Sequence, residues 1–371
     1  MRRLRQRNAA MLAAALTLAA YGCAHQYLDP RFYGQMREPI PDHTPKTVQI
    51  RFLGVGGFLV QRGTDVVMTA PFYTNPDETF LLGTKQVQPN KSLIKELLPA
   101  RWVKDTAAIL VGHTHYDHFM DVPYVATELA KDAVLYGSVT MKQLAMAPGN
   151  KVDETRIVTV SNVGGQDFVD YRQCSVEPKE GCHYLAGSSG DWIKVNARVR
   201  IRALCSRHAP VPGLGVPFKG CLSSLPLEPK RAGDWKLGDT YAYLIDFLDS
   251  TTGKPDFRVY YQDSATAPTF GFVPPELTID KRVDVALLCG AGFNAVKDNP
   301  ERIMKNTDPR YVIFGHWENF FKPQTKPLES LPYFDYSNLV ARMDALASGT
   351  PPWKGKFWVA APGNLFVFEP E

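Results

Sequence analysis

The sequence predicts an α/β protein in which helices cover the strands of a sheet. Short apolar runs such as Ala107–Val111 alternate with segments of helical character in the first half of the chain. Alternating βα units of this kind place helices against the faces of a sheet. In the second half, the odd positions from Val195 to Ala203 are apolar, and the even positions include Arg198, Arg200 and Arg202. This period of two predicts a half-buried strand.

The predicted elements begin with a β-hairpin of Thr47–Val60 and Asp65–Met68, joined around Arg62 and Gly63. Three glycines between positions 54 and 57 lie within its first arm. A phosphate-binding loop would need a Lys-Ser or Lys-Thr pair after them, and none follows. We therefore interpret these glycines as a strand twist or a close approach of the backbone.

The remaining elements follow the same periodicities. They are helices at Ser92–Leu98, Val122–Lys131 and Ser337–Ala347, and strands at Ala133–Tyr136, Tyr241–Phe247, Phe257–Tyr261, Val283–Leu288, Tyr311–Phe314 and Lys356–Phe368. The arginine stripe leaves two interpretations open, a solvated sheet face and a surface that attracts an anionic substrate. Residues 164–192 and 209–235 are rich in Gly, Pro and Cys and are predicted insertions that either control access to a site or decorate the scaffold.

The charge balance argues against a nucleic-acid partner. The 371 residues include 42 Lys and Arg and 38 Asp and Glu, a formal net charge of +4. Four of the positive charges lie at the N-terminus, at Arg2, Arg3, Arg5 and Arg7, so the rest of the chain is close to neutral. A neutral chain lacks the excess of Lys and Arg that neutralises nucleic-acid phosphates.

The N-terminus has the pattern of an export signal. The arginines precede an apolar run from Met11 to Ala20, which is too short for a membrane span. We expect a signal peptide over residues 1–22. The junction Gly22-Cys23 resembles a bacterial lipobox, which implies lipidation of Cys23, a tether over residues 23–46 and a membrane-anchored place in the cell envelope facing the periplasm. The alternative is ordinary cleavage nearby and a secreted protein.

Five cysteines remain in the mature chain. Export places them in a compartment that permits disulfides. Cys289 ends an apolar run and is expected to be a buried thiol. The other four allow three pairings, of which we favour the short loops Cys174–Cys182 and Cys205–Cys221.

The densest cluster of chemically functional residues follows the strand at Ala107–Val111. His113, His115, Asp117 and His118 lie within six consecutive positions. Imidazole nitrogens and carboxylate oxygens are ligands for zinc and similar divalent ions. His113 and His115 can point the same way in extended chain, whereas Asp117 and His118 need a turn, which lets one loop serve a second ion.

This HxHxDH pattern resembles that of the metallo-β-lactamase superfamily, and later residues fit the family's order. His208, Asp263 and His316 each come at or just after the end of an apolar strand. The motif form is closest to the branch that contains N-acylphosphatidylethanolamine phospholipase D and the ascorbate-phosphate lactonase. The resemblance covers residues 48–368 and implies a four-layer αββα sandwich, with residues 47–371 as its domain.

The resemblance also implies a centre of two metal ions. His113, His115 and His208 would hold one ion, Asp117, His118 and His316 would hold the other, and Asp263 would bridge them. A metal-bridged hydroxide would be the nucleophile and Asp117 would orient it, so Asp117 and Asp263 are the expected catalytic residues. Redox di-iron relatives usually carry a glutamate where His115 stands. Histidine there favours zinc and hydrolysis of an ester, lactone or phosphodiester.

The chain departs from the family pattern at one place. The first hairpin usually ends in Asp-Pro, whose carboxylate supports the ligand histidines, and here the residues are Ala70 and Pro71. Loss of such support costs roughly 10–100-fold in metal affinity or activity, unless Asp77 or another acid replaces it.

Three further residues are candidates for a substrate pocket. Trp317 and Phe320 follow the ligand His316, and His183 lies in the first insertion. Core packing is the alternative explanation for the two aromatic residues. We expect a small-molecule or lipid-like substrate. The competing function is a non-catalytic envelope lipoprotein that uses the fold as a binding module.

Overall fold

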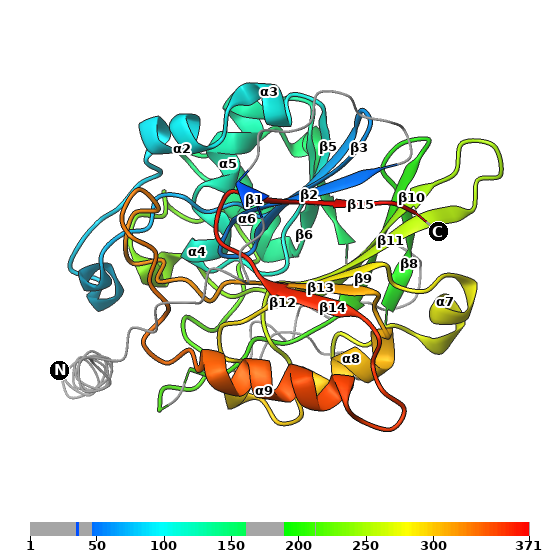
Figure 1. Cartoon of the computed structure of the whole chain (residues 1–371). Helices are drawn as coiled ribbons and strands as arrows, with labels where there is room; N and C mark the ends of the chain where they lie inside the picture. Colours follow the sequence, from blue (N-terminus) through cyan, green and yellow to red (C-terminus); the bar gives the residue numbers. More distant parts are fainter. Residues whose placement is uncertain (1–34, 37–46, 161–188, 212, 371) are drawn as a thin grey trace.

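The structure is a computed structural model that describes residues 35–36, 47–160, 189–211 and 213–370. The predicted signal peptide, Cys23, Cys174, Cys182 and His183 lie outside these residues. In the described part, two mixed β-sheets pack face to face, with α2 (Lys91–Leu97) and α3 (Ala100–Val103) on one outer side and α8 (Glu301–Thr307) and α9 (Tyr336–Ala347) on the other (Figure 1). This arrangement confirms the four-layer αββα sandwich.

The first sheet has eight strands in the order β1-β15-β2-β3-β4-β5-β6-β7. They are β1 (Gln35–Met36), β2 (Val48–Gly54), β3 (Gly57–Arg62), β4 (Asp65–Thr69), β5 (Thr106–Leu110), β6 (Val134–Gly137), β7 (Ile157–Thr159) and β15 (Asn364–Phe368). Pairing is antiparallel from β1 to β4 and parallel from β4 to β7. Strand β1 lies within the segment that we expected to be an irregular tether.

The second sheet has seven strands in the order β14-β13-β12-β11-β10-β9-β8. They are β8 (Ser189–Lys194), β9 (Val199–Cys205), β10 (Tyr241–Leu248), β11 (Pro255–Gln262), β12 (Val285–Cys289), β13 (Tyr311–Gly315) and β14 (Lys356–Val359). Strands β9 and β11 are both antiparallel to β10, and β11 to β14 are parallel to one another. The carboxyl ends of β9, β11 and β13 therefore meet at one edge of the sheet.

The remaining helical segments are short. They are the α-helices α4 (Tyr116–Phe119), α5 (Val122–Tyr124), α6 (Val139–Met146) and α7 (Pro275–Asp280), a π-helix at Val125–Leu129, and 3₁₀ turns at Glu78–Leu82, Glu154–Arg156, Ala232–Asp234 and Phe293–Ala295. None of the described helices is long and apolar enough to cross a membrane. Of the predicted helices, Ser92–Leu98 and Ser337–Ala347 correspond to α2 and α9, whereas Val122–Lys131 ends at Leu129 and is a π-helix in its second part.

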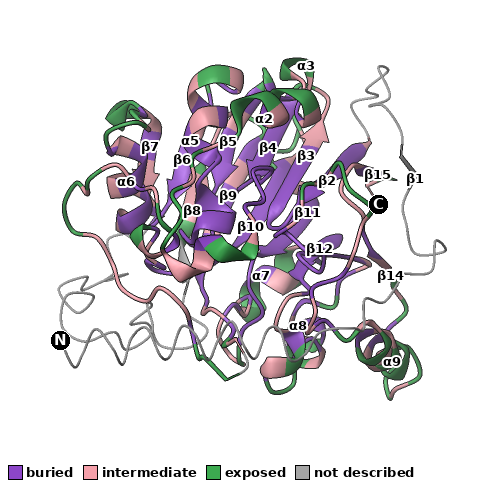
Figure 2. Cartoon of the chain, turned by 90° about the vertical axis from the view of Figure 1, so that its left-hand side faces the viewer, coloured by how far each residue is buried: buried purple, intermediate pink, exposed green. Residues whose placement is uncertain are grey.

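A buried apolar core joins the two sheets. Alternate residues of β2 and β9, including Ile50, Phe52, Ile201 and Ala203, contribute to it because side chains alternate between the faces of a strand. The opposite faces pack against the helices through residues such as Ile94 of α2. Figure 2 shows the strands buried and the exposed residues concentrated on the helices and loops.

The arginine stripe stabilises the sheet. Arg198 pairs with Asp65 at 2.5 Å, and Arg200 pairs with Asp246 at 2.8 Å. The guanidinium carbon of Arg200 also lies 4.0 Å from the ring centre of Trp192. These contacts with carboxylates and an aromatic ring favour the sheet-face interpretation over recognition of an anionic substrate.

Two predicted strands are wrong in their extent. The run Lys356–Phe368 forms β14 in one sheet and β15 in the other, because Ala361 and Asn364 close a turn between them with a backbone bond of 3.0 Å and a side-chain bond of 2.9 Å. The predicted strand from Val195 begins only at Val199. The side chain of Asn196 closes a turn there, because its Oδ1 atom accepts hydrogen bonds from the backbone amides of Arg198 and Val199.

The first arm of the predicted hairpin, Thr47–Val60, is also two strands. The chain turns between β2 and β3 at Val55 and Gly56. Gly54 and Val55 have φ angles of 109° and 52°, the left-handed region that reverses the chain tightly. The glycines therefore mark a turn and a close approach rather than a twist within one strand.

The predicted disulfide Cys205–Cys221 is wrong. Cys205 is a buried thiol at the end of β9, where the alternation of the strand directs its side chain into the core between the sheets. Cys221 is disulfide-bonded, and since Cys205 and Cys289 form no disulfide, its partner lies outside the described residues. Cys289 is a buried thiol, as predicted. The predicted Cys174–Cys182 bridge also lies outside the described residues.

Candidate metal centre

The HxHxDH loop follows β5 and changes direction at His115. His115 precedes the first turn of α4, and the backbone amide of His118 donates to its carbonyl oxygen at 2.9 Å. Asp117 and His118 therefore lie in a helical turn, whereas His113 and His115 precede it, as the spacing predicted. Gly112 leads into the loop, and its carbonyl oxygen accepts from the amide of Tyr241 at 2.8 Å, which ties the loop to the start of β10 in the other sheet.

The second sheet delivers the other candidate ligands at one edge. His208 follows β9, Asp263 directly follows β11, and His316 directly follows β13. These parallel strands end at the same edge, so their next residues converge. His316 has a φ of 55°, unusual for a residue with a side chain, and a conformation of this kind is often found at functional sites.

The first group comprises His113, His115 and His208. Their ring centres are 4.7 Å apart for His113 and His115, 4.8 Å for His113 and His208, and 4.7 Å for His115 and His208. One ligand atom from each lies within 4.8 Å of the others, so the three could hold one ion.

The second group comprises Asp117, His118 and His316. The Nε2 atoms of His118 and His316 are 3.0 Å apart, and Asp117 Oδ2 lies 3.6 Å from the former and 3.5 Å from the latter. Three potential ligand atoms thus converge on one point. The side chain of Asp117 is 11% exposed, so a small part of this group reaches solvent.

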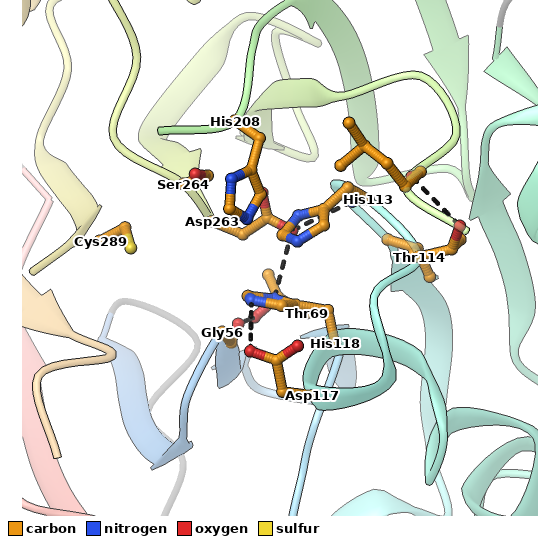
Figure 3. Close-up of polar contacts among 12 residues, drawn as sticks. Gly56, Thr69, His113, Thr114, Asp117, His118, His208, Asp263, Ser264 and Cys289 are labelled. Atoms are coloured by element: carbon orange, nitrogen blue, oxygen red, sulfur yellow. Dashed lines mark hydrogen bonds and ion pairs between the residues drawn. The ribbon is translucent and has the colours of Figure 1, made fainter. Parts of the chain in front are cut away.

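Asp263 lies between the two groups. Its Oδ2 atom is 3.0 Å from Nδ1 of His113 and 3.4 Å from Nδ1 of His118, and it also accepts from the backbone amide of His113 at 3.1 Å. Figure 3 shows His113, His208 and Asp263 clustered together, with His118 and Asp117 beyond them and Gly56 beside His118. All seven predicted ligands are therefore brought together in two groups and a shared carboxylate, and ligation itself remains a prediction.

The donor set fits a divalent cation. Among the described residues, His113 Nε2 and Asp263 Oδ1 are buried polar atoms without a hydrogen-bond partner. A buried polar atom without a partner is destabilising, and a cation would provide the missing interaction for both. Nitrogen and carboxylate oxygen in this combination are typical ligands of zinc.

Burial keeps three of the histidines, His115, His118 and His208, neutral. It lowers the pKa of His115 and of His118 well below the usual value, with further lowering from neighbouring histidines, and it lowers the pKa of His208 to about 3. Neutral imidazole has the lone pair that a metal requires. Burial acts to raise the pKa of Asp117, but the hydrogen bond with His316 and the nearby imidazoles outweigh it, so the net pKa of Asp117 is lowered and the group is an anion.

Two backbone carbonyls fix which ring nitrogens are available. A carbonyl can only accept, so His115 donates from Nε2 to Pro217 O at 3.0 Å and keeps its lone pair on Nδ1. His208 donates from Nδ1 to Ala209 O at 2.5 Å and keeps its lone pair on Nε2. Pro217 belongs to the second insertion, whose Phe218 ring centre is 5.9 Å from that of His115. This insertion therefore forms part of the centre, which the sequence did not show.

Asp77 does not replace the acid that the family pattern has at the position of Ala70. Ala70 is fully buried at the end of β4. Asp77 caps the 3₁₀ turn Glu78–Leu82 and pairs with Lys85, with its side chain about half exposed. The buried carboxylate of Glu318, two residues after His316, lies closer to the ligands in sequence and was missed.

The aromatic pocket candidates differ in their surroundings. The Trp317 indole nitrogen donates to Ala360 O at 2.6 Å inside the core, and the side chain is almost completely buried. Phe320 has its ring centre 5.1 Å from that of His316. Phe320 therefore borders the centre, whereas Trp317 packs in the core. His183 lies outside the described residues.

Comparisons with known proteins gave structural similarities only. No protein-family model matches the sequence, and a search of curated proteins found no match. The structure is similar to Igni18, a metallo hydrolase from Ignicoccus hospitalis KIN4/I, with 16% identity and a TM-score of 0.46 over 88% of this chain and 100% of that chain. For isothiocyanate hydrolase from Delia radicum gut bacteria, the identity is 16% and the TM-score 0.44, over 87% and 99%.

A third similarity is to YhfI, a metallo-beta-lactamase fold protein from Bacillus subtilis. Here the identity is 12% and the TM-score 0.43, over 87% of this chain and 100% of that chain. At these identities and TM-scores, resemblance assigns no activity, metal or substrate to this chain.

The space at Gly112 gives a direct test of the centre. A methyl group there would lie 2.3 Å from the Asp263 carboxylate, so Gly112→Ala should displace the carboxylate and weaken zinc binding by roughly 10–100-fold or more. Metal content of the purified variant measures this. Gly233→Ala is the control, since the nearest atom to its methyl would be 3.9 Å away. Full metal content in Gly112→Ala would contradict the position assigned to Asp263.

The lowered histidine pKa values predict a pH dependence for the metal-free protein. Below pH 6.5 the unfolded chain binds a proton at His208, whereas the folded chain does so only near its pKa of about 3. The free energy of unfolding should therefore fall as the pH is lowered from about 7 to 5. His208→Gln should reduce this slope in urea unfolding. Equal slopes in both proteins would contradict the assigned burial of His208.

Proposed function

We propose that this chain is a divalent-metal-dependent hydrolase of an ester, lactone or phosphodiester. The observation that carries the proposal is the carboxylate of Asp263, whose one oxygen approaches a histidine from each of two ligand groups. A single shared anion between two groups of nitrogen and carboxylate ligands suits a pair of cations, and zinc is the proposed metal.

The chemistry supplied by two such ions is the polarisation of substrate oxygens and a lowered pKa of water. His113, His115 and His208 would hold one ion, and Asp117, His118 and His316 the other. Asp263 would separate and balance them. Because the hydrogen bonds to Pro217 and Ala209 already leave a lone pair on Nδ1 of His115 and on Nε2 of His208, no change of tautomer is needed on binding.

Asp117 is the proposed residue for orienting water. Its carboxylate is an anion, and it is more exposed than the fully buried carboxylate of Asp263. A water molecule at the centre can donate a hydrogen bond to Asp117 while it faces the substrate. Phe218 and Phe320 border the two groups and would exclude solvent from an apolar part of a small-molecule or lipid-like substrate.

Neither nearby nucleophilic side chain suits covalent catalysis. Burial raises the pKa of Cys289, so its sulfur is a thiol rather than the reactive thiolate. The hydroxyl of Ser264 accepts from the amide of Ala209 at 3.0 Å and serves the loop that carries His208. Water is therefore the proposed nucleophile.

Asp263→Ala tests the shared carboxylate. Without the anion between them, two cations would repel one another, so the variant should bind fewer than the two zinc ions expected of the wild type and lose more than about 100-fold in hydrolysis. Metal analysis and turnover of a generic phosphodiester and a lactone measure both effects. Asp77→Ala, at an exposed acid that pairs with Lys85, is the matched control.

The outcomes separate the proposal from its competitor. Wild-type protein that binds zinc but hydrolyses neither substrate would support the binding module. An Asp263→Ala protein that keeps two ions and full activity would refute the assignment of the carboxylate.

We also propose that the protein is exported and held to the membrane at Cys23. The support is the basic, apolar and Gly-Cys order of residues 1–23. Cys23→Ser should move the protein from the membrane fraction to the periplasm, as measured by fractionation and immunoblotting. A wild-type protein found only in the soluble periplasmic fraction would contradict the anchor.

A further inference from the structure

The turn between β2 and β3 lies directly against one of the candidate ligands. A methyl group at Gly56 would lie 2.7 Å from Nδ1 of His118 and 2.9 Å from the hydroxyl of Tyr261. The other ring nitrogen of His118, Nε2, faces His316. The turn therefore supports the imidazole on the side away from its contact with His316.

Two hydroxyl groups hold the carbonyl oxygen of Gly56. Tyr261, on β11, donates to it at 2.9 Å, and Thr69, on β4, donates to it at 2.5 Å. Thr69 also accepts from the amide of Phe58 at 2.7 Å. The turn is thus attached to the strand that ends at Asp263 and to its own sheet.

A buried carboxylate holds the same turn from a third direction. Glu318 accepts a short hydrogen bond from the amide of Val55, the residue with the left-handed backbone. Glu318 is 2% exposed and follows the candidate ligand His316 by two residues. The turn is therefore connected to the loops that carry Asp263 and His316 as well as to His118.

We propose that Tyr261 and Glu318 are positioning residues that set the orientation of His118 through the turn 54–57. Neither residue contacts the point where the ligand atoms converge, so each acts through the backbone of Val55 or Gly56. The inference rests on the proposed metal centre and concerns only its second group.

Removal of one hydroxyl group tests the proposal. Tyr261→Phe should weaken binding of the second zinc ion by roughly 10–100-fold, the range for lost support of a ligand, and leave the first ion within threefold of wild type. Titration of the metal-free protein with zinc against a chromophoric chelator measures both dissociation constants. Cobalt(II) in the second site should also show an altered visible absorption spectrum, because the orientation of one ligand has changed.

Tyr260→Phe is a matched control. Tyr260 lies next to Tyr261 on β11, is equally buried, and donates to the carbonyl oxygen of Gly271 at 2.8 Å, away from the turn. Tyr260→Phe also loses the hydrogen bond that its hydroxyl accepts from Gln262 at 2.9 Å, so its loss of thermal stability should be at least as large as that of Tyr261→Phe. Only Tyr261→Phe should change zinc affinity. Equal zinc affinities for the two variants would overturn the proposal.

Substitution of Glu318 provides the second test. Glu318→Gln keeps an oxygen that can accept from Val55 and should stay within a few-fold of wild type, whereas Glu318→Ala should weaken the second ion as Tyr261→Phe does. Wild-type affinity in Glu318→Ala would overturn the role of Glu318. If Glu318→Ala does not fold, Tyr261→Phe still decides the proposal. A wild-type protein that binds no zinc at all would instead refute the proposed function.

Discussion

The burial of one carboxylate among histidines is the constraint on which the centre depends. The side chain of Asp263 has no exposed area, and an anion removed from water is strongly destabilising without partners. The neighbouring groups that meet its Oδ2 atom are a backbone amide and two imidazoles. Burial also lowers the pKa of His115, His118 and His208, so these three histidines offer lone pairs rather than positive charge. A cation is the group that balances such a set.

The two sheets create this burial by letting their strand ends approach closely. Gly112 and Gly56 contribute because they lack side chains where Asp263 and His118 come against the backbone. Hydrogen bonds that cross between the sheets at this edge include those of Gly112 with Tyr241, Tyr243 with Val111, Tyr261 with Gly56 and Glu318 with Val55. The packed core below makes the edge rigid, so small groups placed there are held at fixed distances.

The sequence predicted which candidate ligand residues come together, because their chemistry and the strand ends before them are local signals. His113, His115, Asp117 and His118 are adjacent in the chain, and the apolar strands before His208, Asp263 and His316 are visible from composition. Contacts without a local signal were missed, such as the hydrogen bond between His115 and Pro217, which are 102 positions apart in the sequence.

The incorrect pairing of Cys205 conflicts with a pattern visible in the sequence. Cys205 continues the alternation of Val199, Ile201 and Ala203, whose side chains point into the core. The error at Lys356–Phe368 arose because periodicity shows strand character and cannot show to which sheet a strand belongs.

The disulfide at Cys221 has a consequence for when the centre becomes complete. Cys221 lies four residues after Pro217, whose carbonyl oxygen accepts a hydrogen bond from His115. The disulfide therefore restricts the segment that orients this candidate ligand. A crosslink lowers the number of conformations open to a loop. In a reducing environment that segment would be freer to move and His115 less firmly oriented. The order of the candidate metal centre would thus be coupled to the oxidation state of its surroundings, and in an exported protein oxidation of this disulfide would accompany assembly of the site.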